Sequence, residues 1–175
     1  MGQPIPTHGE SVSGNISLLL DCNLAYTLSQ IIEYRTFKVL YTSRDDWQLH
    51  TDILRCNPLF HGHARHDSVI VDTGGVDKIS FAKLIFMFKC TVFNTVYNIA
   101  LVRYYHPSPP QSVTRSDKLT GFQRISLSPP KNAEFLFLNS VIRGAYVAPA
   151  SDTRPNEFFV NDLIDSDMHI RLRDR

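Results

Sequence analysis

The chain has 175 residues, of which 43% are hydrophobic and 20% charged, and its formal net charge at pH 7 is +1. This composition is ordinary for a globular protein, and the length suits one domain with a loose extension. A net charge so close to zero argues against charge-driven binding of nucleic acid by the whole surface, although a local basic patch stays open.

The cysteines and the lengths of the apolar segments indicate the cellular compartment to expect. Cys22, Cys56 and Cys90 lie far apart, are odd in number and form no CxxC pair, so a zinc ribbon or a disulfide framework is disfavoured. We find no secretory leader pattern and no apolar run of about 18 residues that could span a membrane. We therefore expect an intracellular protein with reduced thiols and no cofactor, and the nucleus is one of the compartments left open.

The first third of the chain predicts a tail, a helix and a strand. Residues 1–15 are rich in proline and glycine and poor in apolar side chains, which is typical of a disordered tail. After Asp21, a candidate cap, apolar residues recur with the spacing of one helical face. These residues are Leu24, Leu28, Ile31 and Ile32. With a strand expected at 36–42, we assign residues 16–54 to an N-terminal helix and the first strand.

The most apolar segment of the chain predicts a β-hairpin. Two runs, 81–90 and 96–105, are rich in β-branched and aromatic residues, and Asn94 favours a turn between them. Strict alternation would place one apolar set on one face of the first strand, namely Ala82, Leu84, Phe86, Phe88 and Cys90. Lys83 and Lys89 would then share the other face. An apolar face of this kind needs further strands to cover it.

Further short strands are expected on both sides of this hairpin. Candidates lie at 69–71, 121–127, 134–138, 141–147 and 158–164. Turns and loops separate them, with 56–66 interpreted as a loop, 106–119 as an exposed proline-rich loop and 165–168 as a turn. Many short strands with turn signals at about every 8–12 residues predict a mainly β fold, and we expect a small, partly open β-barrel over residues 55–175.

The order of several motifs resembles one known family. The segment 60–71, FHGHARHDSVIV, is similar to an F-x-G-x-x-R-Y-D-x-V-L-V signature, and 158–168 is similar to a closing V-D-x-I-D-x-D-M. Both signatures belong to the C-terminal β domain of proteins encoded by basidiomycete transposable elements of the Plavaka and KDZ type. The resemblance covers roughly residues 55 to 172. His66 and His169 depart from it, because the family has tyrosine and phenylalanine there.

A looser likeness of fold links the chain to BAH domains, through a hydrophobic strand pair, a long loop and a strand reading V-I-R-G-x-x-V. The two resemblances imply a transposon-derived accessory module without enzymatic activity, whose partner is a protein, chromatin or nucleic acid. A degenerate remnant without activity is an alternative. A fold-level likeness alone does not determine function.

Candidate binding residues come from aromatic and charged positions. Tyr104 and Tyr105 could line an aromatic cage that holds methylated lysine by cation–π attraction, with Trp47 and Phe122 as further walls. Arginine is suited to phosphate but often pairs with a nearby acid instead. The complete set of predicted binding residues is Arg65, Asp67, Tyr104, Tyr105, Arg143, Asp165 and Asp167.

A metal-dependent nuclease or hydrolase is the enzymatic alternative. His61, His63 and His66 form the densest group of possible ligands, and a His-x-His pair on a strand would direct two rings to one side. The acids between Glu157 and Asp167 could serve the same chemistry, although a solvated loop and an Asx turn are the favoured interpretations. Because no G-x-S-x-G, P-loop or HExxH motif is present, we expect no enzymatic activity.

Overall fold

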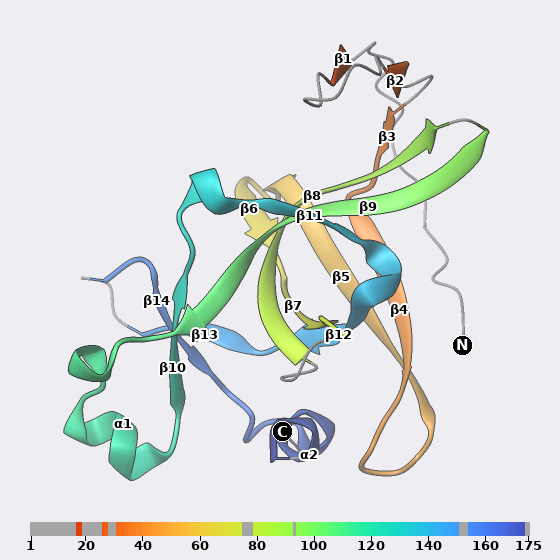
Figure 1. Ribbon diagram of the computed structural model, residues 1–175. Helices are drawn as coiled ribbons and strands as arrows, with labels where there is room; N and C mark the ends of the chain where they lie inside the picture. Colours follow the sequence, from red (N-terminus) through yellow and green to blue (C-terminus); the bar gives the residue numbers. More distant parts are fainter. Residues whose placement is uncertain are drawn as a thin grey trace.

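The computed structural model describes residues 17–18, 26–27, 31–74, 79–92, 94–150 and 154–173, and it is drawn in Figure 1. Its strands are β1 (Ser17–Leu18), β2 (Tyr26–Thr27), β3 (Ile31–Glu33), β4 (Thr36–Thr42), β5 (Leu49–Phe60), β6 (His63–His66), β7 (Ser68–Asp72), β8 (Ile79–Val92), β9 (Thr95–Pro107), β10 (Gln123–Leu127), β11 (Glu134–Phe137), β12 (Val141–Ala145), β13 (Val147–Pro149) and β14 (Glu157–Val160). The helical segments are short: η1 (Pro110–Ser112), α1 (Arg115–Thr120), η2 (Pro130–Asn132), η3 (Leu138–Ser140) and α2 (Ser166–Arg173).

The strands form antiparallel sheets, which confirms the mainly β prediction. The largest sheet has the order β12-β7-β8-β9-β10-β14-β13, with β3 also paired to β8 and β11 to β9. A smaller sheet has the order β4-β5-β6, and β1 pairs with β2. Over the described residues each order is an open path, and no pairing closes the largest sheet into a barrel.

The central hairpin forms as predicted, but its faces differ from the prediction. The strands β8 and β9 pair along nearly their whole length, and Asn94 takes the left-handed conformation (φ 62°) in the turn. A β-bulge between Leu84 and Phe86 shifts the register. Because an extra residue reverses the alternation beyond it, Leu84 packs into the main core while Phe86 and Phe88 lie in a cluster on the opposite face.

The predicted N-terminal helix is wrong where the structure describes it. Residues 26–27 and 31–33 are strands, and Ile31, Ile32 and Glu33 pair with Cys90, Lys89 and Phe88 of β8. The apolar spacing that favoured a helix is overridden because β8 offers a strand edge to pair with. The other residues of that prediction, and the expected tail at 1–15, lie outside the described residues.

Three segments expected to be loops or turns contain regular elements, and in 106–119 the element is α1 (Arg115–Thr120). The strand β5 continues to Phe60, and β6 begins after a turn in which His61 and Gly62 both have positive φ (50° and 83°). The expected turn at 165–168 begins α2 instead. The carboxylate of Asp165 accepts a hydrogen bond from the amide of Met168 (2.9 Å), as a helix N-cap does.

The main core lies between the two larger sheets. It combines Phe37, Val39 and Leu54 of the β4-β5-β6 sheet with Leu84 and Val102 of the largest sheet, all nearly solvent-free. A second cluster lies under α2, and its buried residues are Ile70, Phe81, Tyr105, Ile125, Leu127, Val160 and Met168. Each buried side chain of this size stabilises the fold by about 1.5–3 kcal/mol, so the cores fix the two sheets and α2 as one frame.

Candidate functional site

A cleft of about 350 Å³ opens beside the smaller sheet, within the size range of ligand-binding sites. It lies between β5, the connection from β6 to β7, and the segment from β12 to β13. Its lining residues are Asp52, Ile53, Leu54, Arg65, His66, Asp67, Ser68, Arg143, Gly144, Ala145, Tyr146 and Val147. Three of the predicted binding residues, Arg65, Asp67 and Arg143, therefore meet at one place.

One wall of the cleft is a strand edge without a neighbouring strand. On one side, residues 49–55 of β5 pair with β4. On the other side, β6 pairs with Cys56, Asn57 and Phe60 only. No described strand pairs with the second edge of residues 49–55.

The direction of each backbone group on this edge follows from hydrogen bonds at its two ends. The carbonyl of Gln48 accepts from the amide of Ser43 (2.9 Å), so residue 48 faces β4. The amide of Arg55 donates to the Asp67 carboxylate (2.8 Å), and its carbonyl accepts from the Asp67 amide (2.9 Å), so residue 55 faces away from β4. Because successive residues of a strand alternate in direction, residues 49, 51 and 53 direct their N–H and C=O groups to the open edge.

The opposite wall stands close to β5 at a glycine. The amide of Gly144 donates to the Asp52 carboxylate (2.9 Å). A Cβ atom at Gly144 would lie 3.2 Å from that carboxylate oxygen and 3.2 Å from Leu54 Cδ2. The residue type at this position therefore sets how closely β12 approaches β5.

The floor of the cleft carries a buried arginine that is bound by acids. Arg143 is 2% exposed, and its guanidinium bonds both oxygens of Asp165 (2.9 and 2.6 Å) and one oxygen of Asp167 (2.6 Å). Its Nε lies 3.5 Å from Asp52 and makes no hydrogen bond within the described part of the chain. The guanidinium also stacks on the Tyr41 ring, 4.5 Å from the centroid. Arg143 thus joins β12, the β4–β5 hairpin and α2.

The two acids bound to Arg143 are held as carboxylates. Burial alone would raise the pKa of Asp165, but hydrogen bonds from Arg143 and Met168 outweigh it and lower that pKa. Burial would also raise the pKa of Asp167. Hydrogen bonds from Arg171, the Arg44 amide and Arg143 outweigh this effect and lower that pKa. Groups so fully engaged are suited to holding α2 in place rather than to accepting a proton in catalysis.

The mouth of the cleft carries a partly exposed cation. Arg65 donates from Nε to Asp67 (2.9 Å) and stacks over the Phe60 ring at 5.1 Å. Its side chain is 42% exposed. A guanidinium so placed can donate hydrogen bonds to a carboxylate or a carbonyl of a ligand.

Cys56 and His66 lie close together but do not form a catalytic pair. The Cys56 Sγ atom is 3.4 Å from His66 Nδ1. Burial, with the nearby charges of Glu33 and Asp67, raises the pKa of Cys56 to about 12, and burial lowers the pKa of His66. Since the thiolate is the nucleophile, a buried neutral thiol offers no nucleophilic chemistry here.

The histidines of the metal hypothesis do not come together as expected. The His-x-His strand that the metal hypothesis requires does not form, because His61 occupies the turn and β6 begins only at His63. Within residues 31–74, 79–92, 94–150 and 154–173, no three His, Cys, Asp or Glu side chains are arranged to hold a metal ion. Asp162 instead contacts His169 at 3.0 Å.

The predicted aromatic residues lie in different parts of the fold. Tyr104 packs against the main core, and Tyr105 is buried in the second cluster, where its hydroxyl lies 3.0 Å from Ser68 Oγ. Trp47 is 78% exposed at the tip of the β4–β5 hairpin. The Phe122 ring contacts Phe159.

The sequence analysis missed Thr51, Asp52 and Ile53 as site residues, because it expected no strand between residue 42 and the loop at 56–66, where β5 lies. The alternating apolar residues Leu49 and Ile53 were the available signal of a strand.

Comparisons with protein-family models, with curated proteins and with solved structures find no match to this chain. None of the helices in the described residues has the length and apolar character needed to span a membrane. The site must therefore be interpreted from its own geometry.

Proposed function

We propose that this chain is a non-catalytic interaction module that binds an extended segment of a partner protein by strand addition at the open edge of β5. The observation that carries the proposal is the unpaired edge of residues 49–55 beside the cleft. In strand addition, main-chain hydrogen bonds supply affinity, and pockets for alternate side chains supply specificity.

The cleft supports this proposal through its chemistry. Ile53 presents an N–H and a C=O group to it, and Leu54, Ala145 and Val147 supply apolar lining. Arg65 at the mouth favours a ligand that carries an acidic residue or a free carbonyl. Protein is favoured over nucleic acid because the net charge is only +1 and the exposed residues along β5 include the aliphatic Leu49, Ile53 and Leu59.

The proposal includes the origin and the finer architecture expected from the sequence. The motif order over residues 55 to 172 supports a module related to the C-terminal domain of basidiomycete transposable-element proteins. Packing of the β4-β5-β6 sheet over the largest sheet around the main core supports a partly open, BAH-like barrel. The division of the chain at residue 55 and an intracellular, nuclear location stay predictions.

The test is a selection of random peptides on the full chain, followed by titration of the selected peptides into ¹⁵N-labelled protein. We expect the largest amide shifts at Ile53 and at residues 144–147. Ile53→Pro removes the N–H donor directed at the cleft and leaves the pairing with β4 intact, so it should abolish binding. Ile53→Ala keeps the donor and is the matched control.

Nucleic acid and chromatin are the alternatives that the same protein preparation can test. Binding of double-stranded DNA that weakens steeply with salt and is unaffected by Ile53→Pro would favour a nucleic-acid module instead. Binding of a methylated histone peptide at Tyr104, away from the β5 edge, would favour an aromatic cage. Either result would contradict strand addition at β5.

A further inference from the structure

We infer that the open edge of β5 pairs with the same edge of a second copy of this chain, which makes a two-fold symmetric dimer. The inference rests on the proposed strand addition and names the partner. It is carried by the self-complementary order of residues along that edge and by the hairpin tip that continues it.

An antiparallel pair centred on Thr51 satisfies the backbone of both copies. In this register Thr51 lies opposite Thr51 of the second copy, and Leu49 lies opposite Ile53 of the second copy. All three residues direct their N–H and C=O groups to the open edge, as the hydrogen bonds of Gln48 and Arg55 establish. Residues opposed in this way exchange two hydrogen bonds per pair.

The side chains agree with this register. Leu49 and Ile53 are 69% and 47% exposed, and both lie on the face of β5 opposite to Leu54 and the core. A two-fold axis perpendicular to the sheet leaves these faces on the same side, so each Leu49 contacts an Ile53 of the other copy across the strands. Exposed aliphatic side chains on an unpaired edge are otherwise a liability that proteins avoid.

The hairpin tip supplies a second complementary contact. Beyond Leu49 the register brings Trp47 toward Arg55 of the second copy, where an indole can stack on a guanidinium. Asp45 and Asp46 at the same tip approach the cations Arg55 and Arg65 of that copy. These acids also argue against a lipid surface as the occupant, because anionic headgroups would repel them.

Backbone strain at the hairpin tip supports a role for Trp47 in the proposed dimer contact. Trp47 has φ 58°, a left-handed conformation that is a marked outlier for a bulky residue. Hydrogen bonds fix it there, from the Trp47 amide to the Ser43 carbonyl (3.1 Å) and from the Gln48 amide to Asp46 (3.0 Å). A strained and exposed indole is typical of a binding anchor.

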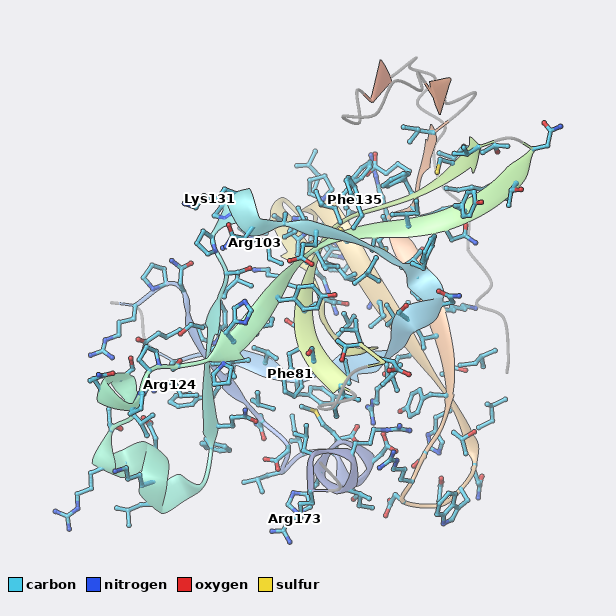
Figure 2. The ribbon with its side chains drawn as sticks, in the orientation of Figure 1. Phe81, Arg103, Arg124, Lys131, Phe135 and Arg173 are labelled. Carbon is cyan, nitrogen blue, oxygen red and sulfur yellow. The ribbon has the colours of Figure 1, made fainter. Side chains whose placement is uncertain are left out.

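A different apolar surface is the competing dimer interface. Phe135 and Phe137 of β11 are exposed on the outer face of the β8–β9 region, and Phe135 is labelled in Figure 2. That strand is only four residues long (Glu134–Phe137), whereas the open edge of β5 offers a longer run beside a cleft. Phe137→Ser is therefore the control that separates the two surfaces.

The experiment measures the molar mass of the full chain by sedimentation over a range of concentrations. We expect a dimer with a dissociation constant on the order of 1–100 µM, because the interface is small. Thr51→Pro removes both donors at the two-fold axis and should weaken the dimer by about tenfold or more. Thr51→Ala keeps the donors and Phe137→Ser changes the other surface, so both should leave the dissociation constant unchanged.

Cross-linking keeps the inference testable if Thr51→Pro fails to fold. In a Cys22→Ser background, Thr51→Cys should cross-link to itself with a short bifunctional thiol reagent, because opposed Cα atoms would lie about 5.5 Å apart. Val96→Cys, exposed at the far end of the β8–β9 hairpin, should not. A dimer that fails to cross-link at position 51, or that Phe137→Ser dissociates, would overturn the inference.

The inference and the proposed function fail in different ways. The chain could stay monomeric at the highest concentration and yet bind selected peptides in a manner lost in Ile53→Pro. That result would contradict the dimer and support strand addition by a different partner. Protection of the amides of residues 49, 51 and 53 from hydrogen exchange in a monomer would show that this edge is already paired. That result would overturn both.

Discussion

Replacing Arg143 by methionine should be among the most destabilising single changes in this protein. Methionine fills similar space but leaves Asp52, Asp165 and Asp167 without their shared cation, and Arg171 bonds Asp167 alone of these three acids (2.7 Å). Removing one partner from a buried ion pair typically costs about 3–5 kcal/mol. That is a large share of the roughly 5–15 kcal/mol by which such domains are stable.

The assay is equilibrium unfolding in urea, with hydrogen exchange of α2 measured on the same samples. We expect the midpoint to fall with an unchanged slope, and the α2 amides to exchange before those of β8. Adding Asp165→Asn to the Arg143→Met variant removes one uncompensated charge and should restore part of the loss. A loss below about 1 kcal/mol would refute the reasoning, because it would mean that water screens this network as it screens a surface pair.

The effect of pH on this variant has a definite sign. In the native chain the pKa values of Asp165 and Asp167 are lowered. Their contribution to stability is therefore present above the unfolded value of about 3.9, and it is lost as the pH falls through the lower folded values. Without Arg143, the pKa values of both acids should rise above those in the native chain, because fewer hydrogen bonds then oppose the effect of burial. The difference in stability between native chain and variant should then shrink below about pH 4, and a difference that grows on acidification would contradict the assignment.

Three further predictions follow from local geometry. Gly144→Ala should cost about 1 kcal/mol in urea unfolding, because its Cβ would crowd the Asp52 carboxylate and Leu54, unless these neighbours relax fully. Iodoacetamide at pH 8 should leave Cys56 unmodified in the folded chain and label it on unfolding, because its thiol is buried with a pKa of about 12; rapid labelling of the native state by mass spectrometry would disprove this. Trp47→Gly should stabilise the isolated chain by about 1 kcal/mol, since glycine suits the left-handed conformation, while weakening association in sedimentation; loss of stability would show that the indole packs on its own chain.

Local chemistry predicted some elements well. The β8–β9 hairpin follows from two apolar runs flanking Asn94, a residue that tolerates the left-handed conformation found there. The bulge after Leu84 was not predictable, because it depends on how two strands fit together. Ile31 and Ile32 have helical spacing, yet they form a strand because β8 presents an edge that no local pattern reveals.

The candidate site was predictable in residue type but not in arrangement. An arginine such as Arg143 often pairs with an acid, but the sequence did not indicate which acids, and its observed partners are Asp165 and Asp167. Those acids become neighbours of Arg143 only because the chain folds so that the start of α2 lies beside β12. The open edge of β5 is a property of strand order, so only the complete topology shows it.

A second network of ion pairs joins β10, α1 and β14. Arg124 bonds Asp117 through two nitrogens (2.9 and 3.0 Å) and Glu157 through a third (2.7 Å), and Figure 2 labels it beside α1. Asp117 also forms the capping box of α1 with Thr114. Both networks lie where short helices meet strand ends, so charge pairing fixes elements that are too short to be stable alone.

The network around Arg143 also determines how rigidly the binding edge is presented. Helix α2 holds the β4–β5 hairpin next to its turn, because the Arg44 amide donates to Asp167 (2.6 Å) and Arg171 donates to the Thr42 carbonyl (2.6 Å). In Figure 1 the turn end of this hairpin lies beside α2. A hairpin held beside its turn loses little conformational entropy when a partner strand pairs with it, and preorganisation of this kind strengthens binding without any added contact. The buried arginine, although it contacts no partner, therefore acts on association through the geometry of the strand that does.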